Sequence, residues 1–178
     1  MAILPIRTYG DPVLRQPTGL IADVDGALVR LVEDMFETMY AAPGVGLAAN
    51  QVGVQRRMFV YDIGDGPGVV INPEIVESDG DWTYYEGCLS IPDLAFDVVR
   101  PKRVRLVGVG LDGETLDLEA DEVLARCFQH EVDHLDGVLL VQRLDPERRR
   151  EAMRVLRNRA LGTGDTDSSV VLAGRSPL

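Results

Sequence analysis

His130 and His134 are the residues of this chain whose types and spacing best fit catalysis. They are the two histidines of the sequence and lie four positions apart in the segment His-Glu-Val-Asp-His. On an α-helix such residues are about 6 Å apart on one face, so both imidazoles can bind a single metal ion. Glu131 lies between them, where its carboxylate can reach a water molecule on that metal and act as a general base. The pattern predicts a metal-dependent hydrolase.

The third metal ligand stays open between cysteines and carboxylates, because the sequence has no further histidine. Cys127 lies on the same predicted helix but about 10.5 Å along its axis from His134, which is too far for a shared ion. We therefore interpret Cys127 as a small buried apolar residue. Cys88 ends a predicted strand and can face the helix, and a Cys-His-His set leaves one position open for water. Glu147 and Glu151, on a later helix, are the carboxylate alternatives.

Two other functions use a similar pattern. Zinc proteases share the H-E-x-x-H-x-x-G pattern, which this sequence matches through Gly137, but the third histidine of their longer pattern would fall at Leu140. A binding module stabilised by a structural metal is the second alternative. Such a site has no need of a glutamate between its histidines, so Glu131 favours an enzyme.

Apolar residues at helical spacing predict three helices, at residues 24–40, 122–136 and 146–160. Asp121 is the expected N-cap of the second helix, and Gly137 is expected to end it. Polar residues of this helix form a stripe opposite its apolar face. The stripe consists of Glu122, Arg126, Gln129, Asp133 and Asp136.

Strand-like runs lie mainly between the first two helices. They cover residues 57–63, 69–75, 82–89, 98–109 and 115–118, with a short additional strand at 138–142. The last two of the main runs read as a hairpin around Asp112-Gly113, and residues 44–51 read as a glycine-rich turn. This order predicts an α+β fold. We expect antiparallel or mixed β-sheets packed around the central HExxH helix, with an N-terminal and a C-terminal helix.

The length of 178 residues fits one domain, which we place at residues 1–160, with a flexible tail at 161–178. A formal net charge of −11 argues against a surface that binds DNA or an anionic membrane. We find no apolar run long enough to span a membrane and no signal peptide, and two cysteines do not form a disulfide framework. We therefore expect a cytoplasmic protein.

Three segments together resemble peptide deformylase of the bacterial type. They are GVGLAANQ at residues 44–51, EGCLS at 86–90 and QHEVDH at 129–134. The resemblance extends from the N-terminus to about Arg159. It implies that the enzyme removes the N-formyl group from the N-terminal formylmethionine of newly synthesised polypeptides and releases formate.

The resemblance also implies roles for individual residues. Cys88, His130 and His134 would hold one Fe(II) per chain, replaceable by zinc, nickel or cobalt, although ligand geometry alone favours zinc. Glu131 would be the catalytic acid/base. The residues expected to stabilise the oxyanion are Gln51, through its side-chain amide, and Leu89, through its backbone N–H. The residues expected to contact substrate are Gly44, Val45, Gly46, Tyr84, Gly87 and Cys127.

Arginines mark two further features. Arg126 either folds over the methionine pocket with its charged head in water or lies exposed on the polar stripe. The third helix carries Arg148, Arg149, Arg150, Arg154, Arg157 and Arg159. Basic residues so concentrated on an acidic protein favour an anionic partner. Because bacterial deformylases dock a C-terminal helix on the ribosome, the resemblance implies ribosome contact here.

Overall fold

The computed structural model describes residues 2–162, and this part of the chain confirms the α+β class. The expected tail therefore lies outside the described residues, apart from Leu161 and Gly162. The helices are α1 (Gly26–Ala41), α2 (Glu122–Leu135) and α3 (Pro146–Ala160), with three short 3₁₀ helices, η1 (Pro12–Arg15), η2 (Ala49–Val52) and η3 (Leu140–Gln142). The strands are β1 (Gly46–Ala48), β2 (Met58–Tyr61), β3 (Gly68–Asp79), β4 (Trp82–Gly87), β5 (Ala95–Arg100), β6 (Arg103–Val109) and β7 (Thr115–Asp121). None of the helices within residues 2–162 is both long and apolar enough to cross a membrane.

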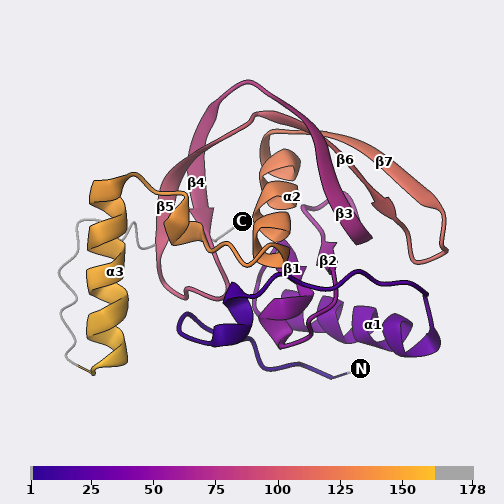
Figure 1. Ribbon diagram of the computed structural model, residues 1–178, viewed down its shortest axis with the longest axis horizontal. Coiled ribbons are helices and arrows are strands. Elements are labelled where there is room, and N and C mark those ends of the chain that lie inside the picture. Colours follow the sequence, from indigo (N-terminus) through magenta and orange to yellow (C-terminus); the bar gives the residue numbers. More distant parts are fainter. Residues whose placement is uncertain (1, 163–178) are drawn as a thin grey trace.

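The strands form two antiparallel sheets. The larger sheet has the order β1-β2-β3-β6-β7, and β4 pairs with β5 in a separate two-stranded sheet. The predicted hairpin around Asp112-Gly113 is confirmed as β6 and β7, and Gly113 adopts a positive φ of 83° in its turn. Figure 1 shows β3, β6 and β7 arching over α2, while α1 runs along the opposite side of the molecule.

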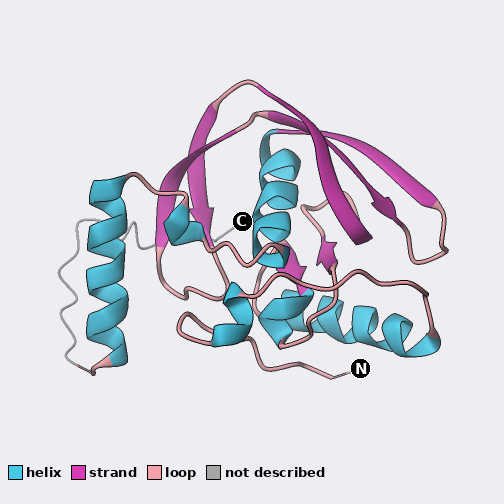
Figure 2. Ribbon diagram, in the orientation of Figure 1, coloured by secondary structure: helices cyan, strands magenta, loops and turns pink. Residues whose placement is uncertain are grey.

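Helix α2 is covered on two faces. Its apolar face packs against the large sheet, where the Phe128 ring lies 5.8 Å from that of Phe59. The opposite polar stripe is also buried, at Arg126, Gln129 and Asp133, because the β4–β5 hairpin and its exit loop cover it. Gly137, with a φ of 74°, ends the helix as expected. The secondary structure around α2 is shown in Figure 2.

The two outer helices begin at aspartate caps. Asp25 accepts a hydrogen bond from the N–H of Leu28 at the start of α1, and Asp145 accepts from the first turn of α3, where Pro146 stands first. The buried side of α1 packs against β1 and β2. The buried side of α3 packs against β5 and the segment after β4, so α3 lies next to the chain that follows Cys88.

Three predicted elements differ from the structure. The glycine-rich turn at 44–51 contains β1 and η2, because Gly46–Ala48 pairs with the end of β2. The single run at 98–109 is divided between two sheets at Pro101, which has no backbone N–H to continue a ladder. The short strand at 138–142 is the 3₁₀ helix η3, whose entry is fixed because the side chain of Gln142 accepts from the N–H of Leu139.

The start of α2 differs from expectation in one detail. Asp121 occupies the N-cap position, but its side chain makes no capping hydrogen bond. The next residue, Glu122, has a positive φ of 45°, and its N–H donates to the carbonyl of Lys102. The start of the helix is therefore held by a backbone hydrogen bond to the β5–β6 connection and not by a side-chain cap.

Candidate metal centre and active site

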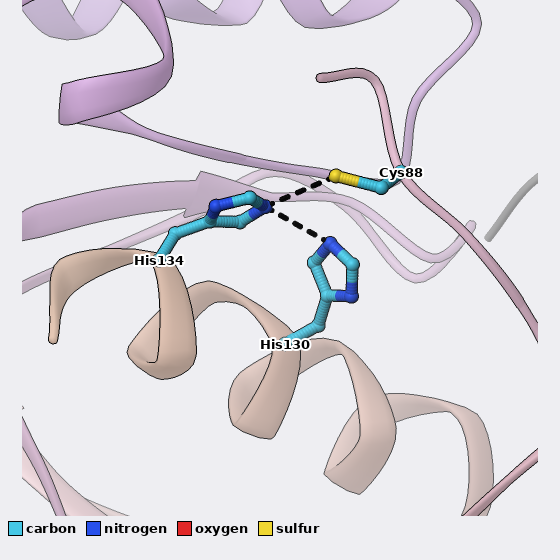
Figure 3. Close-up of side chains that lie close together, drawn as sticks. All are labelled: Cys88, His130 and His134. Carbon is cyan, nitrogen blue, oxygen red and sulfur yellow. Dashed lines mark hydrogen bonds between the residues drawn. The ribbon is translucent and has the colours of Figure 1, made fainter. Parts of the chain in front are cut away.

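Three side chains of types that bind metal ions meet beside α2. His130 and His134 project from one face of the helix, and Cys88 comes from the loop that follows β4 (Figure 3). All three are buried, and their donor atoms lie within 4.8 Å of one another. Nε2 of His134 is 3.2 Å from Sγ of Cys88 and 3.1 Å from Nε2 of His130.

These distances fit a tetrahedral ion. Ligand atoms bound at roughly 2.0–2.3 Å in tetrahedral geometry lie about 3.3–3.6 Å apart, close to the two separations of His134 Nε2 from Cys88 and from His130. The surroundings of the two histidines shift their pKa values in opposite directions. Burial lowers the pKa of His134, and the neighbouring His130 lowers it further. Burial would also lower the pKa of His130, but Cys88 and Glu86 raise it well above its usual value.

A carboxylate orients one of the histidines. Oε1 of Glu86, on β4, lies 2.6 Å from Nδ1 of His130, which directs Nε2 toward Cys88 and His134. Nδ1 of His134 has no hydrogen-bond partner within residues 2–162. The side-chain amide of Asn50 donates to the carbonyl oxygen of His134, which ties η2 to the end of α2.

Glu131 lies in the same cavity with a carboxylate that is not fully paired. The side chain is 3% exposed, and Oε2 finds no partner in the described part of the chain. Burial raises the pKa of Glu131 to about 7, the neighbouring His130 lowers it, and Glu86 raises it again. A β-carbon on Gly46 would overlap this carboxylate, so β1 approaches Glu131 closely because residue 46 is a glycine.

The amide of Gln51 has a defined orientation. Its Oε1 accepts from the N–H of Ala48 at 2.9 Å, and its Nε2 donates to Oγ of Ser90 at 3.1 Å. Nε2 therefore points toward the loop that carries Cys88, with Sγ at 4.0 Å. Leu89 follows Cys88 in this loop and lines the same cavity as Gln51.

The cavity lining contains most of the residues predicted from the sequence. It consists of Val45, Gly46, Gln51, Gly87, Cys88, Leu89, Cys127, His130 and Glu131. Cys127 is buried as expected, and burial raises the pKa of its thiol well above the usual value. His134 completes the donor set without lining this cavity. Glu147 and Glu151, the alternative ligands, lie on α3 and are not part of this set.

Two predicted substrate residues lie outside this lining. Tyr84 is 41% exposed, and its ring stacks on that of Trp82 at 4.4 Å. Gly44 lies behind Leu89, whose Cδ1 is 2.7 Å from the position that a β-carbon on Gly44 would take. Gly44 thus leaves room for the Leu89 side chain.

Arg126 corrects both predictions made for it, because it is neither exposed nor folded over the pocket with its head in water. Its side chain is 1% exposed, and Nη1 donates to Oε2 of Glu86 at 2.7 Å. Nη2 donates to the carbonyls of Trp82 and Val98. The β4–β5 hairpin supplies all three acceptors, and its packing on α2 could not be read from the helix pattern.

Sequence reasoning missed the buried charges behind the site. Glu86 also binds Arg100, which donates to Asp133, and Asp133 in turn pairs with Arg143. Glu86 lies within the EGCLS segment, so its position was available, but its partners are separated from it by 14 residues or more. Such a network cannot be predicted from the spacing of residues within one segment of the sequence.

Comparison with known proteins matches residues 3–150 to the model of a family described as polypeptide deformylase. A peptide deformylase of Acidothermus cellulolyticus is 50% identical over 157 residues, covering 88% of this chain and 87% of that protein. A peptide deformylase of Agrobacterium fabrum is 52% identical over 150 residues, covering 81% and 88%.

Solved structures show the same likeness. A crystal structure of a peptide deformylase from Legionella pneumophila has a TM-score of 0.84 at 39% identity, covering 92% of this chain and 99% of that one. A peptide deformylase from Synechococcus elongatus in complex with actinonin has a TM-score of 0.83 at 40% identity, covering 90% and 87%.

Proposed function

Because the chain belongs to the polypeptide deformylase family, whose members remove the N-formyl group from nascent peptides, we propose how its own residues divide that reaction. The reaction hydrolyses an amide: water attacks the formyl carbon, the C–N bond breaks, and formate and a free N-terminal amine are released.

Cys88, His130 and His134 are the proposed ligands of one metal ion. Their buried donor atoms lie within 4.8 Å of one another, and Glu86 leaves Nε2 of His130 facing the other two. We assign Fe(II) as the ion, with zinc, nickel or cobalt able to replace it. A bound metal supplies a Lewis acid that makes water reactive near neutral pH.

Glu131 is the proposed general base and acid. It takes a proton from the attacking water and later transfers that proton to the leaving amine. Two features support this role: its Oε2 is free of protein partners among residues 2–162, and burial places its pKa near 7. A carboxyl with that pKa can both accept and release a proton at neutral pH.

Gln51 and Leu89 are the proposed oxyanion donors. The Gln51 amide is held by Ala48 and Ser90 with its N–H groups toward the Cys88 loop. Such preorganised donors stabilise the negative oxygen that forms when the formyl carbonyl is attacked. The backbone N–H of Leu89 would donate from the same wall.

Formylmethionyl peptides are the proposed substrate of the cavity beside α2. Val45, Gly46, Gly87 and Cys127 line it, while Tyr84 and Gly44 would act from its margins. We further propose that α2 is the central helix around which both sheets are organised, and that the protein acts in the cytoplasm, where formylated chains are made.

The observation that carries this proposal is the meeting of three buried ligand atoms with the Glu131 carboxylate beside one cavity. It is tested with nickel-loaded protein and two peptides, formyl-Met-Ala-Ser and its unformylated counterpart. Formate release from the first and no internal cleavage of the second is the expected result. Cleavage of the unformylated peptide would instead indicate a protease.

The ribosome is the proposed docking partner of α3. All six arginines of α3 are exposed. Arg148 and Arg159 donate to the carbonyls of Asp97 and Pro92 and hold the helix in place, and Arg154 pairs with Glu151. We expect substitution of Arg149, Arg150 and Arg157 by glutamate to abolish co-sedimentation with ribosomes at low salt. Unchanged co-sedimentation would refute the contact.

A further inference from the structure

Arg126 is the largest completely buried side chain within the described residues, and it lies one helical turn before His130. Its Nη1 donates to Oε2 of Glu86 at 2.7 Å, and its Nη2 donates to the carbonyls of Trp82 at 2.8 Å and Val98 at 3.1 Å. The guanidinium also lies over the Trp82 ring, 5.1 Å from its centroid. Its Nε has no hydrogen-bond partner within residues 2–162, so the bonds of Nη1 and Nη2 are the ones that fix the position of this buried charge.

The Glu86 carboxylate is shared between this arginine and a proposed metal ligand. Its Oε1 accepts from Nδ1 of His130 and from Nη2 of Arg100, both at 2.6 Å. Its Oε2 accepts from Nε of Arg100 at 2.8 Å and from Nη1 of Arg126. Each oxygen therefore has two donors, and two guanidiniums compete with one imidazole for a single negative charge.

The buried members of this cluster are balanced in charge. Two carboxylates, Glu86 and Asp133, face two buried guanidiniums, Arg100 and Arg126, while the side chain of Arg143 is 48% exposed. Arg100 bonds to both carboxylates, whereas Arg126 pairs with Glu86. The charge of Arg126 therefore acts on the carboxylate that bonds to His130.

We propose that Arg126 is a positioning residue that weakens the attraction of Glu86 for the Nδ1 proton of His130. A carboxylate bonded to two guanidiniums is a poorer acceptor than one bonded to a single guanidinium. His130 then keeps more of its Nδ1 proton and is a weaker electron donor at Nε2, since outer carboxylates raise the basicity of ligating histidines. This inference rests on the proposed metal site. Arg126 thereby reduces how tightly that site holds a divalent cation.

The test uses Arg126→Met in protein labelled with ¹⁵N-histidine and loaded with zinc. Because the chain has two histidines, the Nδ1–H resonance of His130 can be assigned with His134 as internal reference. We expect this proton to move downfield in the variant, as its bond to Glu86 strengthens. We also expect the zinc dissociation constant to fall by about threefold to tenfold in competition with a chelator, below the effect of losing a whole partner.

Matched variants separate charge from packing. Arg126→Lys keeps a cation near Oε2 of Glu86 and should restore both readouts toward wild type. Trp82→Leu removes the ring over Arg126 but keeps the backbone acceptor, and should leave both unchanged. Arg126→Gln removes the charge while keeping donors for the two carbonyls, and gives the same shift if Arg126→Met does not fold.

The outcomes distinguish this inference from the metal-site proposal. A wild-type chain that binds no zinc, or a Cys88→Ala chain that binds it equally well, would overturn the metal site and this inference with it. A different result would overturn the role of Arg126 alone. In that case zinc binding depends on Cys88, but Arg126→Met and Arg126→Gln leave the Nδ1–H resonance unmoved and the zinc dissociation constant unchanged or larger.

Discussion

Oε1 of Glu86 and Nδ1 of His130 lie 2.6 Å apart in the interior, and Glu86 is completely buried. Burial by itself would raise the pKa of Glu86, but hydrogen bonds from Arg100 and His130 hold it well below the usual range. Glu86 is therefore an anion that fixes His130 with Nε2 turned toward Cys88 and His134. The fold thus orients this proposed ligand without requiring a metal to do so.

Glu86→Gln is expected to weaken metal binding by about tenfold or more, since an amide is a poorer partner for the Nδ1–H of His130 than a carboxylate. The dissociation constant for zinc or cobalt measures this directly. Glu77→Gln, which removes an exposed partner of Arg105 on β3, is the matched control and should not alter it. Equal affinities in both variants would show that Glu86 does not support the ligand.

Gln51→Met is expected to lower kcat by about 10²–10³ while the protein keeps its metal, because one oxyanion donor is lost and the side-chain length is nearly preserved. The measurement is steady-state formate release together with metal analysis. Gln55→Met changes a glutamine that bonds to the carbonyl of Val13 and should retain activity. A Gln51 variant with wild-type kcat would remove this residue from the proposed oxyanion site.

Gly46→Ala is expected to lower kcat/KM by at least about tenfold, because the new methyl group would overlap the Glu131 carboxylate and displace it. Gly26→Ala, at the start of α1, is the control, since its nearest neighbour is 3.7 Å away and an alanine suits a helix. The prediction fails if both variants are fully active, or if Gly46→Ala loses activity only through loss of the folded state in circular dichroism.

The stability of the metal-free protein is expected to depend on the protonation of Glu131. Its pKa is about 7 in the native state against an ordinary 4.5, so the native state binds the extra proton between these values. The free energy of unfolding therefore decreases as pH rises from about 4.5 through about 7, by roughly 3 kcal/mol.

In the Glu131→Gln variant the side chain at this position does not titrate, so this contribution to the pH dependence is absent. In urea unfolding with a chelator present, wild type should be comparable to the variant near pH 4.5 and less stable than it at pH 8. A constant difference between the two proteins across this range would show that burial does not raise the pKa of Glu131.

The spacing of His130 and His134 was sufficient to predict a metal site, because an α-helix places residues four apart on one face whatever surrounds it. The helix bounds and the Asp145 cap follow equally local rules. Cys88 is different. It lies 42 positions before His130 in the sequence, so spacing left it among several candidates, and it was assigned through the resemblance of its segment.

The polar stripe of α2 shows what local pattern cannot provide. Arg126 and Asp133 have the periodicity of an exposed face, yet both are buried by the β4–β5 hairpin, which brings Glu86 and Arg100 against them. Whether a charged stripe meets water or other charges depends on long-range packing. A helical pattern therefore identifies the stripe but not its partners.

The most direct test of the account is formate release from formyl-Met-Ala-Ser by wild type, Glu131→Gln and Cys88→Ala, with the metal content of each preparation measured. The account predicts that wild type is active, that Glu131→Gln retains metal and loses nearly all activity, and that Cys88→Ala loses both. Substantial activity in metal-loaded Glu131→Gln would contradict the assignment of Glu131 as the group that moves the proton.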